Sequence, residues 1–307
     1  MEVKNFKFVS DTDGLEIDAM AIIPDGQIKA LVQIAHGMCE YKERYIDFMN
    51  FLAGKGYVCV ISDHRGHGKS IKSDNDLGYM YEGGAEGLVE DLHKLMKMTK
   101  DKFGTELPYY LLGHSMGSLI VRCFAKKYDG EIDKLAVVGS PSDKPGKSLG
   151  LFFARIIEKI RGERGKTDFL TGLTVEGYEK PFKDENIRHA WVNSDRAAVE
   201  AYNNDPLCNY TFTNNGYKNL ISITKDTYDL KNWKMENPDM PIYFFSGAQD
   251  PCAAGKKAFE KSADFMRRAG YKNVRTKMYE NMRHEILNEP DHMQVYEDIE
   301  TFFNEGR

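Results

Sequence analysis

Ser115 lies in the motif Gly113-x-Ser115-x-Gly117, in which the residue types and their spacing suit nucleophilic chemistry. The apolar run at residues 109–112 predicts a buried strand before the motif, and apolar residues at helical spacing follow it directly. Such a strand-to-helix turn strains the serine backbone and exposes its hydroxyl, while the two glycines relieve crowding. We therefore predict that Ser115 is a nucleophile; the alternative is an idle serine in a glycine-bounded turn.

A serine hydroxyl needs a neighbouring base at neutral pH, and that base needs a carboxylate to orient it. At turns of this kind the partners follow in the order serine, acid, histidine. Three histidines come after Ser115, namely His189, His284 and His292. We predict His284 as the base because it follows the last expected strand, whereas His189 falls in an expected insertion and His292 in an expected terminal helix.

The orienting acid should also follow a strand. Asp250 comes four residues after an apolar β-type run, and Asp143 offers the same position one strand earlier. We favour Asp250 because its strand should lie nearer the strand that carries His284. Asp143 stays open as the alternative, with a turn or N-cap as its other role.

Attack by a serine on a carbonyl creates an oxyanion, which two backbone N–H groups normally bind. The expected donors are Met116, next to the serine, and Met38, in the loop after the apolar run at residues 30–35. Gly37 would let that loop approach closely. We interpret Cys39, in the same loop, as a bystander.

The segment at residues 63–70 superficially resembles a phosphate-binding loop because it ends in Gly68-Lys69-Ser70. That motif requires a glycine five residues before Gly68, and this position holds Asp63. We predict a structural glycine-rich turn, and no catalytic role for His64 or His67.

The elements that must position these residues alternate between strand and helix. Near-continuous apolar runs at residues 30–35, 57–62, 109–112 and 135–138 alternate with amphipathic helical patterns, which predicts a mostly parallel sheet with helices on both faces. The polar candidates follow these strands, at the edge where such sheets carry their sites. Residues 3–8 and 15–23 predict a half-exposed antiparallel hairpin at the sheet edge.

The alternation stops at about residue 141 and resumes at about residue 240. The intervening segment is helical in pattern and rich in large apolar side chains, which predicts a helical cap inserted over the site. We therefore divide the chain into a core, residues 1–140 and 240–307, and a cap (lid), residues 141–239. An apolar stripe that includes Phe152, Phe153 and Ile156 is predicted to line the substrate pocket.

Size and charge restrict the partners of this chain. It has 307 residues, a net charge of −5 and five cysteines without metal-binding spacing. This composition argues against nucleic-acid binding and predicts reduced thiols in a cytoplasmic protein. We expect no cofactor and no metal ion, and we find no membrane-spanning run or signal peptide pattern.

Five motifs along the chain together resemble the α/β-hydrolase superfamily, and most of all its branch of monoacylglycerol lipase and lysophospholipase-like serine hydrolases. They are residues 36–40 (His-Gly-Met-Cys-Glu), 63–70 (Asp-x-Arg-Gly-x-Gly-x-Ser), 113–117 (Gly-His-Ser-Met-Gly), 246–251 (Ser-Gly-x-x-Asp-Pro) and 283–286 (Arg-His-Glu-Ile). The resemblance implies an α/β-hydrolase fold with a mobile cap that shapes an acyl pocket. It also implies the roles assigned above to Ser115, Asp250, His284, Met38 and Met116.

The leading functional hypothesis is therefore a serine carboxylic-ester hydrolase that acts through an acyl-enzyme on monoacylglycerol, lysophospholipid or similar small acyl esters. One alternative is a serine peptidase or amidase on the same fold. Another, of a different class, is a non-catalytic binding protein. The expected partner is a small acyl ester, with transient contact between the cap and a lipid surface; the oligomeric state is left open.

Overall fold

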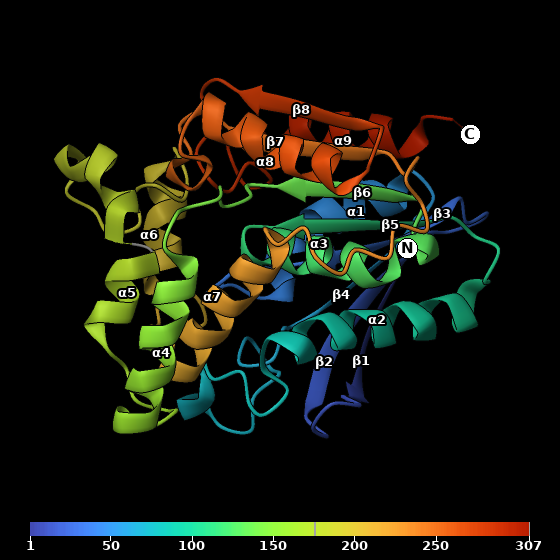
Figure 1. Cartoon of the computed structure of the whole chain (residues 1–307). Helices are drawn as coiled ribbons and strands as arrows, with labels where there is room; N and C mark the ends of the chain where they lie inside the picture. Colours follow the sequence, from blue (N-terminus) through green and yellow to red (C-terminus); the bar gives the residue numbers. More distant parts are fainter. Residues whose placement is uncertain (175, 307) are drawn as a thin grey trace.

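The computed structural model in Figure 1 describes residues 1–174 and 176–306 of the chain. Eight strands in this part form one sheet, in the order β1-β2-β4-β3-β5-β6-β7-β8. The β1·β2 and β2·β4 pairs are antiparallel, and the remaining pairs are parallel. The strands are β1 (Glu2–Val9), β2 (Glu16–Ile23), β3 (Ala30–Ala35), β4 (Tyr57–Ser62), β5 (Tyr109–His114), β6 (Lys134–Val138), β7 (Ile242–Gly247) and β8 (Val274–Tyr279).

Helices cover both faces of the sheet, which explains why its central strands are apolar on both sides. On one face, α1 (Ile46–Gly54) and α9 (His292–Asn304) pack on alternate residues of the strands. On the other face, α2 (Gly84–Phe103), α3 (Met116–Tyr128) and α8 (Lys256–Ala269) pack on the intervening residues. The predicted fold class, a mostly parallel sheet between two helical layers, is therefore confirmed.

Strand register brings the candidate residues to one edge of the sheet. The β3·β5 ladder pairs Ala35 with Gly113, so the loop after β3 and the turn that carries Ser115 begin side by side. The β7·β8 ladder pairs Gly247 with Tyr279, so the loops that carry Asp250 and His284 also leave the sheet as neighbours.

The hairpin at the start of the chain differs from its prediction in one respect. β1 is an edge strand with mostly exposed side chains. β2 pairs with β4 on its other edge, and its two faces are buried because their side chains join the two opposite core layers. Met20 packs under α1, and the Asp18 carboxylate lies 2.6 Å from the buried ammonium of Lys42. The alternation in sequence indicated exposure because the buried partner of Asp18 lies far along the chain.

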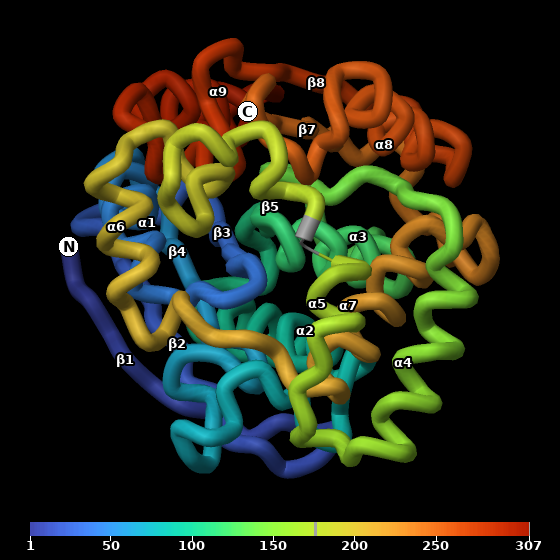
Figure 2. The backbone as a smooth tube through the Cα atoms, turned by 90° about the vertical axis from the view of Figure 1, so that its left-hand side faces the viewer, coloured from blue at the N-terminus to red at the C-terminus, as the bar shows by residue number. Residues whose placement is uncertain are grey.

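A helical segment is inserted between β6 and β7, at the carboxyl ends of the parallel strands (Figure 1). Its helices arch around the ends of β3 and β5 when viewed from that side (Figure 2). They are α4 (Lys147–Arg161), α5 (Asp168–Thr174), the 3₁₀ segment η4 (Glu176–Glu185), α6 (Arg196–Asn204) and α7 (Asn214–Thr227). The last of these, α7, packs against α2, α3 and α4 and shares the main core. The division into a core and a separate cap stays a prediction.

No helix in the described part of the chain combines the length and the apolar character needed to cross a membrane.

Candidate active site

Ser115 occupies the tight turn between β5 and α3. Its backbone has φ 53° and ψ −118°, a region that residues with a side chain rarely adopt and that the surrounding structure must enforce. Its N–H donates to the carbonyl of Val138 on β6 at 2.9 Å. A Cβ on Gly117 would lie 2.0 Å from the Ala35 carbonyl oxygen, and one on Gly113 would lie 2.4 Å from the Gly117 oxygen. Both flanking positions therefore require glycine for steric reasons.

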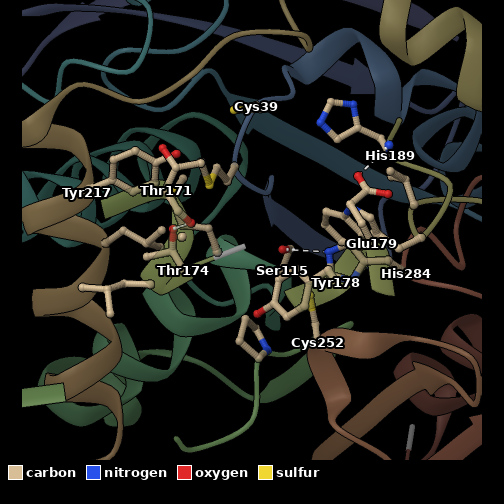
Figure 3. A pocket seen from close by; sticks show the side chains of 18 of the residues that line it. Cys39, Ser115, Thr171, Thr174, Tyr178, Glu179, His189, Tyr217, Cys252 and His284 are labelled. Atoms are coloured by element: carbon tan, nitrogen blue, oxygen red, sulfur yellow. Dashed lines mark hydrogen bonds between the residues drawn. The ribbon is translucent and has the colours of Figure 1, made fainter. Parts of the chain in front are cut away.

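The structure brings Ser115, His284 and Asp250 together, as Figure 3 shows for the first two. The hydroxyl of Ser115 lies 2.8 Å from Nε2 of His284, and Nδ1 of His284 lies 3.0 Å from Oδ2 of Asp250. The other carboxylate oxygen of Asp250 accepts the N–H of Cys252 at 2.8 Å. An imidazole held in this way can take the serine proton while the carboxylate fixes its orientation.

Asp143, the alternative acid, is exposed and forms an ion pair with Lys147 on α4. It follows β6, which is separated from β8 by β7, and so lies one strand further from the His284 loop than Asp250. The strand order explains why Asp250, and not Asp143, contacts the imidazole.

The loop that carries His284 is held by the inserted segment, which the sequence did not indicate. The N–H of His284 donates to the Trp191 carbonyl at 3.4 Å, and the Trp191 ring lies 4.9 Å from the imidazole. The guanidinium of Arg283 donates to the carbonyls of Ala190 and Asn193, at 2.5 and 3.1 Å. Sequence spacing carries no signal for these contacts because 90 or more positions separate the partners.

The two predicted oxyanion donors lie at the same site. The backbone N–H groups of Met38 and Met116 donate to no group among the residues described, and both residues line the cavity beside Ser115. A Cβ on Gly37 would lie 2.9 Å from the Cβ of Ser115, so glycine lets the loop approach the serine. The two amides are thus free to bind a developing negative charge.

Cys39, in the same loop, has an environment unlike that of a reactive thiol. Its side chain is buried and donates a hydrogen bond to the Tyr210 carbonyl at 3.3 Å. Burial, followed by the nearby Cys208, raises the pKa of the Cys39 thiol well above its usual range. A thiol that stays protonated is a poor nucleophile, in agreement with its interpretation as a bystander.

A cavity of about 1250 Å³ opens above Ser115. One side, formed by α5 and α7, is mainly apolar and carries Leu173, Leu220 and Ile221, with the hydroxyls of Thr171, Thr174 and Tyr217 seen in Figure 3. The opposite side is polar and carries Glu179 and His189.

The apolar stripe on α4 does not line this cavity, contrary to the sequence prediction. Phe152, Phe153 and Ile156 are 57, 40 and 38% exposed, on the outer face of the helix. The inner face of α4, with Leu151 and Ala154 buried, packs against α7. The prediction was wrong because it assumed that the more apolar face of an amphipathic helix always turns inward.

The glycine-rich segment at residues 63–70 is a structural turn, as predicted. The Asp63 carboxylate accepts from the ammonium of Lys42 and from the Lys69 N–H, both at 2.8 Å. A Cβ on Gly68 would lie 2.3 Å from that carboxylate. The side chains of His64 and His67, within this turn, are buried.

One group in the described part of the chain has the residue types and spacing of a metal site. The ligand atoms of Asp250, Cys252 and His284 lie within 4.8 Å of one another. A metal ion there would compete with the Asp250–His284 hydrogen bond. It would also require the Cys252 thiolate, whose formation burial opposes by raising the pKa of that thiol.

A mostly parallel sheet with a strained serine turn after β5, an acid after β7 and a histidine after β8 defines the α/β-hydrolase class. A family model described as "Serine aminopeptidase, S33" (Hydrolase_4) matches residues 26–291, and the chain belongs to this family.

Similar proteins extend over nearly the whole chain. A monoacylglycerol lipase of Mycolicibacterium smegmatis is 24% identical over 90% of this chain and 88% of its own length. A thermostable carboxyl esterase of Bacillus coagulans, solved in complex with glycerol, superposes with a TM-score of 0.91 at 25% identity, over 99% of this chain and 98% of that one. The monoglyceride lipase of Saccharomyces cerevisiae shares the fold, with a TM-score of 0.71 at 21% identity over 99% and 94% of the two chains.

Proposed function

We propose that this protein is a serine carboxylic-ester hydrolase that acts through an acyl-enzyme. The observation that carries the proposal is the continuous chain of hydrogen bonds from the Ser115 hydroxyl through His284 to Asp250, with distances of 2.8 and 3.0 Å. The fold, the family and the names of similar proteins support the same class of activity.

In this mechanism His284 removes the hydroxyl proton as Ser115 attacks the ester carbonyl. The carbonyl oxygen becomes negative and accepts hydrogen bonds from the amides of Met38 and Met116, each donor being worth about 3–4 kcal/mol in the transition state. His284 then gives its proton to the departing alcohol. Water, activated by the same imidazole, hydrolyses the acyl-enzyme and regenerates the serine.

We propose small acyl esters, such as monoacylglycerols or lysophospholipids, as the substrates. The apolar side of the cavity suits an acyl group and the polar side suits a hydrophilic alcohol. Names such as monoacylglycerol lipase and carboxyl esterase among the similar proteins favour this class over peptides, although the description of the family names an aminopeptidase.

The test combines a fluorophosphonate probe with a substrate panel. We expect the probe to label wild-type protein and Ser148→Ala, which removes an exposed serine of α4, but not Ser115→Ala. Hydrolysis of p-nitrophenyl esters should exceed hydrolysis of aminoacyl amides at every chain length. Faster amide cleavage would favour the peptidase alternative, and an unlabelled wild-type protein would favour the binding-protein alternative.

We also propose that the outer face of α4 and α5 contacts lipid surfaces. Three exposed rings of this face are neighbours, since the Phe153 ring lies 5.8 Å from that of Phe152 and 6.2 Å from that of Phe169. Exposed cations on α4, among them Arg155 and Lys159, would attract anionic headgroups. The remaining exposed apolar members of this face are Leu149, Ile156 and Ile160.

Flotation with vesicles tests this contact. Wild-type protein should float with phosphatidylglycerol vesicles, whereas a Phe152→Ser/Phe153→Ser variant should not. Leu230→Ser, which removes a 47% exposed leucine outside this face, is the matched control and should behave like wild type. Equal flotation of all three proteins would contradict the proposal.

A further inference from the structure

Glu40 is a buried carboxylate at the end of the oxyanion loop, residues 36–40. It is 2% exposed, and its Oε1 accepts three hydrogen bonds. The donors are the Gly37 N–H, the Tyr45 hydroxyl at 3.0 Å and Nδ1 of His114 at 2.8 Å. Because the Gly37 N–H comes from the turn just before Met38, this carboxylate fixes the backbone that presents the Met38 amide.

His114 precedes the serine and is also buried, at 4% exposure. Its Nδ1 faces the Glu40 carboxylate and its Nε2 faces the backbone carbonyl of His284 at 3.3 Å. A carboxylate and a carbonyl are both acceptors, so both ring nitrogens must carry a proton to satisfy them. The ring therefore fits its surroundings as an imidazolium cation, paired with Glu40.

The pair thus joins three segments that are far apart in sequence. Glu40 accepts a hydrogen bond from Gly37 in the oxyanion loop. His114 is part of the serine turn, and its ring faces the backbone carbonyl of His284. We propose that Glu40 and His114 are positioning residues, whose ion pair holds the oxyanion donor and the general base in register around Ser115. This inference rests on the proposed function.

The electrostatic surroundings agree with the charged pair. Burial raises the pKa of Glu40, but the His114 cation and the Arg44 guanidinium outweigh it and bring this pKa down to about 2. Burial lowers the pKa of His114, but the Glu40 carboxylate and then Glu285 outweigh it and raise this pKa above its usual value. The charged and titratable groups around His114 are Glu40, Arg44 and Tyr45 on one side, His284 and Glu285 on the other, and His36 at the start of the oxyanion loop.

The sign of the pH dependence follows from the raised pKa of His114. The stabilisation that the pair contributes is fully present below the unfolded-state pKa of histidine, near 6.5. It is lost as pH rises through the higher pKa of the folded state. Turnover should therefore decline on the alkaline side as the imidazolium loses its proton.

Two substitutions separate the charge from the packing. Glu40→Gln keeps an oxygen for Gly37 and Tyr45 but removes the charge that stabilises the imidazolium, and His114→Asn keeps a single donor. We expect each to lower kcat about tenfold while KM stays within about twofold, because positioning is disturbed but the apolar and polar walls of the cavity keep their side chains. Since the two residues act as a unit, the double variant should be little worse than either single variant.

The matched control is His93→Asn. It breaks another histidine–glutamate pair, with His93 Nε2 2.9 Å from Glu131 Oε1, on α2 and away from the site. We expect its kcat to equal that of the wild type. Loss of turnover in this control similar to that in His114→Asn would mean that any such pair has only a structural role, and would overturn the inference.

Nitrogen NMR of the wild-type protein tests the pair even if the variants fail to fold. At pH 7 both ring nitrogens of His114 should be protonated, and in Glu40→Gln only one. A neutral His114 ring in the wild type, or unchanged kcat in both variants, would overturn the inference. A wild-type protein that a fluorophosphonate probe does not label would instead reject the proposed function, while the NMR result would still report on the ion pair.

Discussion

The turn at Ser115 and the outer helix α4 are held in place very differently. The serine turn is fixed by strand pairing, by close packing at two glycines and by a hydrogen bond from the Ser115 N–H to Val138 on β6. Helix α4 rests on α7 through one face and exposes large apolar side chains on the other. The residues proposed for chemistry thus lie in the segment with the most constraints, and the exposed apolar side chains lie on a helix that packs through one face only.

The largest expected effect is the loss of the nucleophile in the serine turn. Ser115→Ala should lower kcat for a p-nitrophenyl ester on the order of 10⁶-fold, because the remaining residues have no group to acylate. Progress curves at high enzyme concentration measure this. A decrease smaller than tenfold would mean that another group, or water alone, performs the attack.

The next largest effect concerns the acid. Asp250→Asn should lower kcat by about 10⁴, because the amide favours the wrong imidazole tautomer. Asp143→Asn, at the exposed alternative position, is the control and should leave kcat within twofold of the wild type. The opposite ranking of the two variants would transfer the orienting role to Asp143.

A third substitution tests the close packing of the serine turn. Gly117→Ala would place a Cβ 2.0 Å from the Ala35 carbonyl oxygen. Relieving this clash would require the backbone of β3 or α3 to shift. We expect a loss of about 2–4 kcal/mol in the free energy of unfolding, measured by urea denaturation. Gly54→Ala, with no heavy atom within 4 Å of the new Cβ, should change stability by less than about 1 kcal/mol.

The smallest expected effect lies on the outer helix. Phe152→Ala should change the free energy of unfolding by less than about 0.5 kcal/mol, because this ring is 57% exposed. Its neighbour Leu151 is 8% exposed and packs toward α7, so Leu151→Ala should cost about 2–3 kcal/mol. Similar costs for the two adjacent residues would show that α4 buries both faces, for example against a second copy of the chain.

The features that could be predicted from sequence are those whose signal lies in neighbouring residues of the chain. The serine turn needs its glycines at fixed spacing, and Asp250 and His284 each follow a recognisable strand, so the sequence indicated both the strands and the candidate residues. The parallel sheet followed from its doubly buried apolar strands. In each of these cases the signal lies within about ten residues of the feature.

Features that depend on a distant partner could not be predicted in this way. Asp18 is buried because Lys42 reaches it, and the outward orientation of Phe152 depends on α7 packing against the other face of α4. The contact between Glu40 and His114 joins residues 74 positions apart, and neither carried a chemical signal of its own. Such features become visible only when the tertiary arrangement is known.

The most direct test of the central claim is to trap the acyl-enzyme. Wild-type protein mixed with a p-nitrophenyl ester and quenched in acid within milliseconds should carry the acyl group on the peptide that contains Ser115, with close to one acyl group per molecule in the burst phase. His284→Ala should form this adduct far more slowly, and Ser115→Ala not at all. Rapid hydrolysis without any acylated peptide, or an acyl group found on Cys39 or Cys252 instead, would contradict the account.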